Sequence, residues 1–160
     1  MKPQEESFDN TVALPPRIDF INYIVRDIHK SAELFSAILG VKHWQIREFP
    51  TANDEITVGE PNRQLYAYGT LGETVVELIQ PLSGRSAWSE FLEEHGEGLH
   101  HIGYLVSDLD ERVARLLELG GTILEAGRVW GRRWYCIRIV PSNIIVELEE
   151  DIERSNTVIF

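Results

Sequence analysis

The second half of this 160-residue chain repeats the pattern of the first half at a distance of 81 residues. The matched positions carry identical residues: Ile21 and Ile102, Tyr23 and Tyr104, Val25 and Val106, Asp27 and Asp108, Gly40 and Gly121. The tripeptide Val-Glu-Leu also recurs late in each half, at 76–78 and at 146–148. A repeat of this length indicates two copies of one supersecondary unit, which bury their apolar surfaces by packing together.

Each half is expected to form a strand, a helix and three further strands. Alternating side chains predict the first strand from Arg17 onward, and Asp27 is a candidate N-cap for a helix that Gly40 ends. In the second half, Asp108 and Glu111 have the spacing of a capping box at the start of the helix. The other strands are expected near 41–49, 64–70, 74–80, 99–106, 122–126, 134–140 and 144–149, with a polar loop over 50–63.

These elements divide the chain into five parts. They are a flexible N-terminal arm at 1–16, a first βαβββ module at 17–81, a linker with a short helix at 82–98, a second βαβββ module at 99–150 and a C-terminal tail at 151–160.

Composition excludes several classes of function. Lys and Arg number 15 against 26 Asp and Glu, and the net charge of −11 repels phosphate backbones, so no nucleic-acid partner is expected. The single cysteine, Cys136, excludes an intramolecular disulfide and a Cys-rich zinc site. No apolar run approaches the roughly 20 residues that span a bilayer, and 1–10 lack a signal-peptide core. We therefore expect a soluble cytoplasmic protein without a membrane partner.

Four segments carry a family resemblance. They are Val76-Glu77-Leu78-Ile79-Gln80-Pro81-Leu82, Phe91-Leu92, Gly98-Leu99-His100-His101-Ile102-Gly103-Tyr104 and Ile145-Val146-Glu147-Leu148-Glu149. With the repeated βαβββ order, they resemble the vicinal oxygen chelate superfamily of glyoxalases, bleomycin-resistance proteins and dioxygenases, and within it the methylmalonyl-CoA epimerase branch. The resemblance implies a fold of the α+β class, in which the two βαβββ modules form an open, cup-shaped mixed sheet. It also implies a divalent metal that chelates two neighbouring substrate oxygens.

The resemblance implies metal ligands at four positions, which here hold Phe20, Glu77, His101 and Glu147. The two carboxylates and the imidazole suit Zn, Co, Mn, Ni or Fe(II). Phe20 stands where the family has His, and a phenyl ring offers no lone pair. Asn22 faces the same side as Phe20 and is a weak oxygen ligand candidate. The alternative interpretation is two solvent-facing strand glutamates and a hydrogen-bonded core histidine.

A proton-transfer base is the next expectation from the resemblance. Related epimerases use a Glu just before the third strand and the metal-binding Glu of the last strand. Glu60 lies near the first position and Glu147 occupies the second, so both are candidate catalytic residues. Glu60 also fits a solvated loop acid. His100 is expected to point to the face opposite His101.

The segment 126–138 reverses the charge of the acidic chain. It holds four arginines, two tryptophans and a tyrosine, namely Arg128, Arg132, Arg133, Arg138, Trp130, Trp134 and Tyr135. Guanidinium groups beside aromatic rings suit an anionic or flat conjugated ligand. The alternative is an exposed hairpin whose arginines pair with glutamates. The candidate substrate-binding residues are Phe20, Asn22, Arg128, Trp130, Arg132 and Trp134.

Three functions fit these residues. The leading one is an isomerase (epimerase) or lyase that transfers a proton next to the carbonyl of a small carbonyl compound or acyl thioester, such as an acyl-CoA. The alternatives are a non-catalytic, resistance-type binding protein on the same fold and an Fe(II) oxygenase. A homodimer is also expected, because an open cup leaves strand edges and helix residues such as Phe35 and Leu117 uncovered. The arm and the apolar tail 157–160 are expected to wrap that partner.

Overall fold

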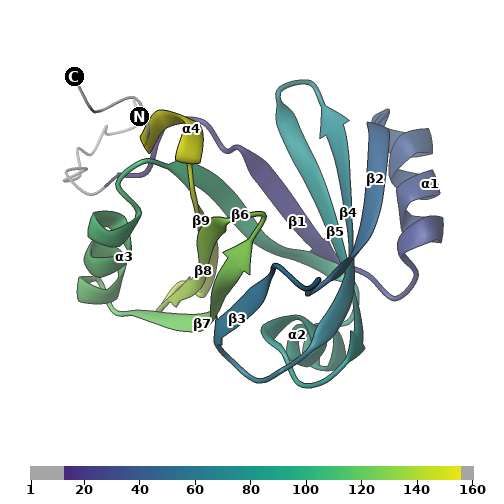
Figure 1. The fold of residues 1–160 in the computed structure, drawn as a ribbon. Coiled ribbons are helices and arrows are strands. Elements are labelled where there is room, and N and C mark those ends of the chain that lie inside the picture. Colours follow the sequence, from purple (N-terminus) through teal and green to yellow (C-terminus); the bar gives the residue numbers. More distant parts are fainter. Residues whose placement is uncertain (1–12, 156–160) are drawn as a thin grey trace, which may run out of the picture.

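The backbone of the protein is a single curled sheet with helices packed against it (Figure 1). The computed structural model describes residues 13–155. The strands are β1 (Phe20–Ile24), β2 (Lys42–Phe49), β3 (Glu55–Val58), β4 (Arg63–Leu71), β5 (Thr74–Ser83), β6 (Gly98–Val106), β7 (Gly121–Val129), β8 (Arg132–Ile139) and β9 (Ile144–Glu150). The helices are α1 (Ile28–Leu39), α2 (Ala87–His95), α3 (Leu109–Glu118) and α4 (Ile152–Ser155).

The strand order β2-β4-β5-β1-β6-β9-β8-β7-β3 places the two modules side by side. β1 runs parallel to β5, and β6 runs parallel to β9, as expected for equivalent strands of two repeats. The modules meet where β1 and β6 pair antiparallel, with Ile21 directly opposite Ile102. Because these two residues are equivalent in the repeat, the register creates an approximate two-fold relation at the centre of the sheet. The predicted α+β cup of two βαβββ modules is confirmed.

The two long outer helices cover equivalent flanks, but they begin differently. In α1 the Asp27 carboxylate accepts from the backbone N–H of Lys30 at 3.0 Å, and Gly40 ends the helix at φ +73°. In α3 the predicted capping box is absent within the described residues: Asp108 accepts from Arg112 Nε at 2.7 Å instead. Spacing alone therefore identified the start of α3 but not the contact that Asp108 makes.

Three apolar clusters support the sheet. One lies beneath α1 around Ile28 and Leu78, and a second lies beneath α3 around Leu109 and Leu148. The third fills the concave side and includes Phe49, Tyr66, Trp88, Trp134 and Cys136. The concave side is thus partly occupied by aromatic side chains as well as by the candidate ligands.

Strand β3 lies inside the segment predicted as a polar loop. It pairs antiparallel with β7, with Ile56 opposite Gly127, and so carries the first module across to the outer edge of the second. A Cβ at Gly127 would collide with the Glu55 carbonyl oxygen, so glycine permits the close approach of the two strands. The prediction of a loop was wrong here because four residues carry little periodicity of their own, and the pairing with β7 forms this strand.

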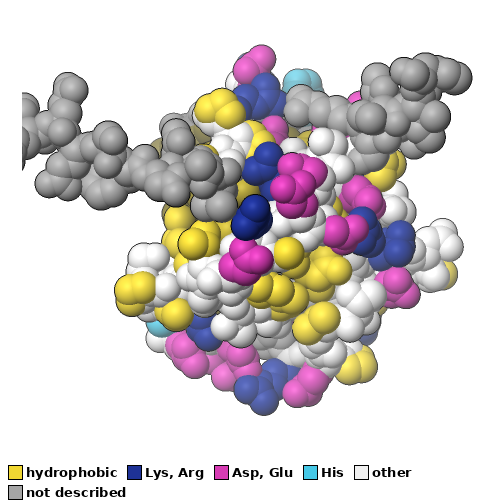
Figure 2. Space-filling model, turned by 90° about the vertical axis from the view of Figure 1, so that its left-hand side faces the viewer, with side chains coloured by type: hydrophobic (Ala, Val, Ile, Leu, Met, Phe, Trp, Pro, Cys, Tyr) yellow, Lys and Arg dark blue, Asp and Glu magenta, His cyan; other side chains and the backbone are white. Residues whose placement is uncertain are grey.

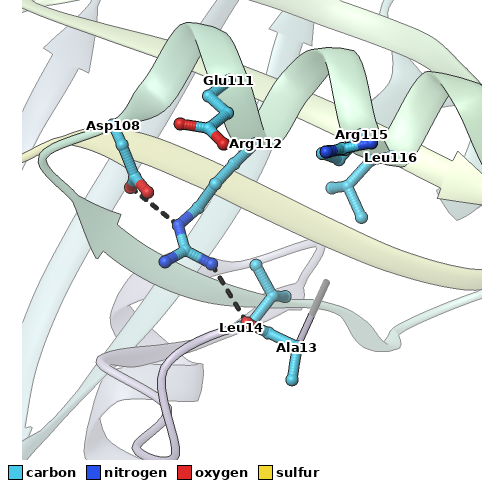
Figure 3. Close-up of a pocket in the computed structure, with 7 residues that line it drawn as sticks. All are labelled: Ala13, Leu14, Asp108, Glu111, Arg112, Arg115 and Leu116. Carbon is cyan, nitrogen blue, oxygen red and sulfur yellow. Dashed lines mark hydrogen bonds and ion pairs between the residues drawn. The ribbon is translucent and has the colours of Figure 1, made fainter. Parts of the chain in front are cut away.

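The end of the predicted arm lies against α3. Arg112 Nη1 donates to the Ala13 carbonyl oxygen at 3.1 Å, and Leu14 packs against the cluster beneath the helix (Figure 3). These residues border a cavity of about 150 Å³. Positions 1–12 and the tail 156–160 lie outside the described residues, and so does the predicted wrapping of a partner by them.

The outer faces of both helices carry apolar side chains. On the α3 side, hydrophobic residues gather among acidic and basic ones (Figure 2). Leu117 is 39% exposed there, and Ile38 on α1 is 70% exposed, whereas Phe35 is partly buried. The expected homodimer stays a prediction. None of the helices within residues 13–155 has the length and apolar character that crossing a bilayer requires.

Candidate metal and proton-transfer site

Three ionisable side chains converge on one point inside the cup. They are Glu77 of β5, His101 of β6 and Glu147 of β9, and their ligand atoms lie within 4.8 Å of one another. His101 Nε2 is 3.4 Å from Glu147 Oε2 and 3.8 Å from Glu77 Oε2. All three are buried. The sheet register produces this grouping, because Asn22 stands opposite both Glu77 and His101.

The donor set fits a divalent cation. Two carboxylates and one imidazole are ligands for first-row divalent metals, and these three are close enough to share one ion. His101 Nε2 and Glu147 Oε2 have no hydrogen-bond partner within residues 13–155, although both atoms are buried. Buried polar atoms are rarely left unpaired, so the two atoms favour a bound group at this point.

Asn22 and Phe20 complete the surroundings of the triad. Asn22 Nδ2 donates to Glu77 Oε2 at 2.9 Å, so this side chain orients the carboxylate. The Phe20 ring lies against Gly103, where a Cβ would collide with it, and its centroid is 6.1 Å from that of His101. The position equivalent to His101 in the repeat therefore presents an apolar ring beside the three candidate ligands.

Replacing Phe20 by His should increase the affinity for Co²⁺, because it adds an imidazole where the repeat has His101. We expect an increase of roughly tenfold or more, measured by calorimetric titration of metal-free protein. Phe20→Leu is the matched control, since it removes the ring without adding a ligand. Equal affinities in the His and Leu variants would show that a side chain at position 20 does not reach the ion.

Burial controls the charge of the triad. Desolvation raises the pKa of Glu77 to about 8, helped by the Glu149 charge and opposed by the hydrogen bond from Asn22. Desolvation, then the Glu77 charge, holds the pKa of Glu147 well above its usual value. Burial, with His100 nearby, keeps the pKa of His101 well below its usual value. Burial therefore favours the uncharged form of each of the three side chains while no cation is bound.

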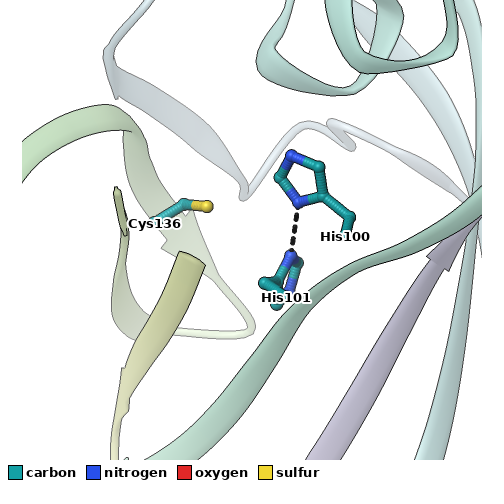
Figure 4. Close-up of side chains that lie close together, drawn as sticks. All are labelled: His100, His101 and Cys136. Atoms are coloured by element: carbon teal, nitrogen blue, oxygen red, sulfur yellow. Dashed lines mark hydrogen bonds between the residues drawn. The ribbon is translucent and has the colours of Figure 1, made fainter. Parts of the chain in front are cut away.

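A β-bulge places His100 next to His101. Pairing of β6 with β1 skips from His101 to Leu99, so His100 is the extra residue. Its Nδ1 lies 2.9 Å from His101 Nδ1, with the Cys136 side chain of β8 directed toward the pair (Figure 4). The prediction that His100 faces away from His101 was wrong, because strict alternation fails at a bulge.

Comparison with known proteins identifies the family. Residues 19–135 match the family model of the Glyoxalase/Bleomycin resistance protein/Dioxygenase superfamily. The chain belongs to this superfamily. An uncharacterized protein of Bacillus subtilis (strain 168), YqjC, is 29% identical over 100 residues, which cover 62% of this chain and 64% of that protein. The chain thus spans slightly less than two thirds of the length of this curated relative.

Solved structures share the superfamily fold. A hypothetical protein from Bacillus halodurans C-125 superimposes with a TM-score of 0.62 at 22% identity, covering 84% of this chain and 94% of that one. Methylmalonyl-CoA epimerase from Mycobacterium tuberculosis gives 0.62 at 21% identity, covering 88% and 91%. A methylmalonyl-CoA epimerase in complex with methylmalonyl-CoA and NH4+ gives 0.61 at 24%, covering 85% and 94%.

Glu60, the other candidate base, lies in a different environment from Glu147. The Glu60 side chain is 66% exposed and lies 3.9 Å from Arg85. It borders a cavity together with Glu125 and the start of α2, and none of the three candidate ligands contributes to that cavity. These contacts agree with the interpretation of Glu60 as a solvated loop acid, and its catalytic role stays a prediction.

The arginine-rich hairpin forms ion pairs with neighbouring carboxylates. Arg128 Nε lies 3.4 Å from Glu55, and Arg132 Nη1 lies 3.4 Å from Glu149. Arg133 joins Asp110 and Glu150, at 2.8 and 2.9 Å. These pairs agree with the second interpretation of the hairpin, in which its arginines neutralise glutamates. Ligand binding by the hairpin stays a prediction.

The two tryptophans of the hairpin differ. Trp134 is buried in the concave cluster, where its centroid is 6.3 Å from those of Trp88 and Phe49. Trp130 is half exposed at the β7–β8 turn, and the Arg47 guanidinium lies 4.4 Å from its centroid. Trp130 therefore links the hairpin to β2 of the first module through a cation–π contact.

Sequence reasoning missed one polar residue on the concave side. Gln64 is fully buried on the same face of β4 as Tyr66, and neither of its amide atoms has a partner in the described part of the chain. The indole Nε1 of Trp88 is likewise buried and unpaired there. The available signal for Gln64 was its place in the alternating pattern with Tyr66 and Tyr68.

Proposed function

We propose that this chain is an epimerase-like enzyme that moves a proton next to the carbonyl of a small carbonyl compound or acyl thioester. Glu77, His101 and Glu147 would hold the divalent cation. The observation that carries the proposal is the convergence of these three buried groups, two of which have unpaired atoms. Titration with Co²⁺ followed by dialysis tests the cation site directly.

Each residue of the triad has a distinct task in this proposal. A divalent cation held there supplies Lewis-acid polarisation of a substrate carbonyl oxygen. Glu147 accepts the proton from the substrate carbon next to that carbonyl and returns it to the same carbon. Burial raises the pKa of Glu147 above its usual value, which makes this carboxylate a stronger base than an exposed glutamate. Asn22 keeps the Glu77 carboxylate oriented through the 2.9 Å hydrogen bond.

Acyl thioesters are the first substrates to test. Several solved structures with this fold are methylmalonyl-CoA epimerases, and one of them contains methylmalonyl-CoA. That likeness supports the choice of an anionic acyl-CoA as the probe. The proton next to a thioester carbonyl is also acidic enough for exchange by a carboxylate base assisted by an electrophile.

The experiment is deuterium exchange in D₂O. Protein loaded with Co²⁺ is incubated with methylmalonyl-CoA and a panel of 2-substituted acyl thioesters, and loss of the proton next to the carbonyl is followed by NMR. We expect exchange with at least one thioester and its loss after removal of the cation by EDTA. Failure to exchange any member while Co²⁺ is bound would contradict the epimerase proposal.

A second candidate is a non-catalytic binding protein on the same fold. The observation that favours it is the apolar ring of Phe20, which lies beside the three candidate ligands where the repeat would place a fourth one. Tight binding of an aromatic acid without proton exchange would support this function. Quenching of tryptophan fluorescence during the same titrations separates the two candidates.

A further inference from the structure

His100 combines burial, a fixed packing environment and a direct contact with a candidate ligand. Its ring packs edge to face against Trp88 and Phe91, with centroids 5.0 and 4.9 Å away. Its Nδ1 lies 2.9 Å from the Nδ1 of His101. A residue in a regular strand would alternate to the other face, so the bulge in β6 creates this contact.

The two nitrogens of His101 have opposite surroundings. Nδ1 hydrogen-bonds to His100, whereas Nε2 faces Glu77 and Glu147 without a hydrogen bond in residues 13–155. A neutral imidazole carries one proton, and the nitrogen without it offers the lone pair that a metal needs. A proton on Nδ1 has His100 Nδ1 as its acceptor at 2.9 Å, whereas a proton on Nε2 would face the glutamate oxygens only at 3.4 and 3.8 Å, without a well-formed hydrogen bond in residues 13–155.

We infer that His100 is a positioning residue. Its Nδ1 accepts a hydrogen bond from the Nδ1–H of His101, so the lone pair of His101 lies on Nε2 and points at the two glutamates. The inference rests on the cation site of the proposed function. In this arrangement His100 carries its own proton on Nε2. His100 also borders a cavity of about 320 Å³ beside His95 and Arg138, which gives that proton access to water.

Two substitutions separate the hydrogen bond from the packing. His100→Phe keeps a ring between Trp88 and Phe91 but leaves the His101 Nδ1 proton without an acceptor. His100→Asn gives up the ring but places an amide oxygen close to the position of Nδ1. His95→Asn is the control, because His95 borders the same cavity and contacts Phe91 but forms no hydrogen bond or ring contact with His101 within the described residues.

The first measurement needs no cation. Ring ¹⁵N shifts of His101 at pH 8 should show a protonated Nδ1 and a bare Nε2 in the parent, in His100→Asn and in His95→Asn. In His100→Phe both neutral tautomers of His101 should be populated. Unchanged His101 shifts in a folded His100→Phe variant, or a proton on Nε2 in the parent, would overturn the inference.

The second measurement is Co²⁺ affinity. We expect a loss of about 10- to 100-fold in His100→Phe, as is typical when the hydrogen-bond partner of a metal-ligating histidine is removed. His100→Asn should stay within about fivefold of the parent. Parent-like affinity in His100→Phe would overturn the inference. If the parent binds no Co²⁺, the proposed function fails, and the ring shifts alone decide the role of His100.

Discussion

Replacing Glu147 by Gln should weaken Co²⁺ binding by at least about 100-fold and abolish measurable proton exchange. Losing a hydrogen-bond partner of a ligand already costs 10- to 100-fold, and this change removes a charged ligand itself. The amide has nearly the same shape, so the fold should persist. The amide also cannot accept the carbon-bound proton, which removes the base as well as the ligand. Calorimetric titration measures the first effect, and deuterium exchange measures the second.

An acid on the other face of the same strand provides the control for this experiment. Glu150 lies on the opposite face of β9 and pairs with Arg133 at 2.9 Å, so Glu150→Gln should leave Co²⁺ affinity and exchange within about twofold of the parent. Parent-like Co²⁺ binding by Glu147→Gln would remove Glu147 from the cation site. Retained exchange in that variant would assign the base to another residue, and Glu60→Gln is then the next variant to measure.

The repeat made the centre of the fold predictable. Equivalent residues of two antiparallel central strands must face each other across the axis that relates them, and Ile21 does stand opposite Ile102. The recurring Val-Glu-Leu likewise placed Glu77 and Glu147 on equivalent strands. Their convergence with His101 follows from that symmetry together with strand alternation.

Features that depend on irregular pairing were not predictable in the same way. The bulge that brings His100 onto His101 breaks the two-residue period on which face assignments rest. Strand β3 exists through its partner β7 in the other module, and no local pattern within Glu55–Val58 specifies that partner. The hydrogen bond from Asn22 to Glu77 joins strands 55 positions apart and became visible only once the register was known.

Raising the pH from about 5 to 8 should destabilise the cation-free protein. The pKa of Glu77 is about 8 in the folded state against an ordinary 4.5, because burial disfavours the charged carboxylate. Between these values the folded state holds a proton that the unfolded chain has released, so stability falls as pH rises. At about 1.4 kcal/mol per pH unit, the loss amounts to roughly 3 to 4 kcal/mol across the window. Urea unfolding at half-unit pH intervals measures it.

Two comparisons assign that loss to the triad. Glu77→Gln should flatten much of the decline, because the amide stays neutral while its oxygen still accepts from Asn22. Saturating Co²⁺ should oppose the decline. The cation and the protons compete for the same carboxylates, and the protons are bound more weakly as the pH rises. The stabilising effect of Co²⁺ should therefore grow with pH. A parent protein whose stability is flat between pH 5 and 8, or in which Co²⁺ stabilises most at low pH, would mean that Glu77 is ionised in the folded state without a cation. Desolvation would then be too weak to raise the pKa of Glu77, and the same burial would not supply the raised pKa that the proposal assigns to Glu147.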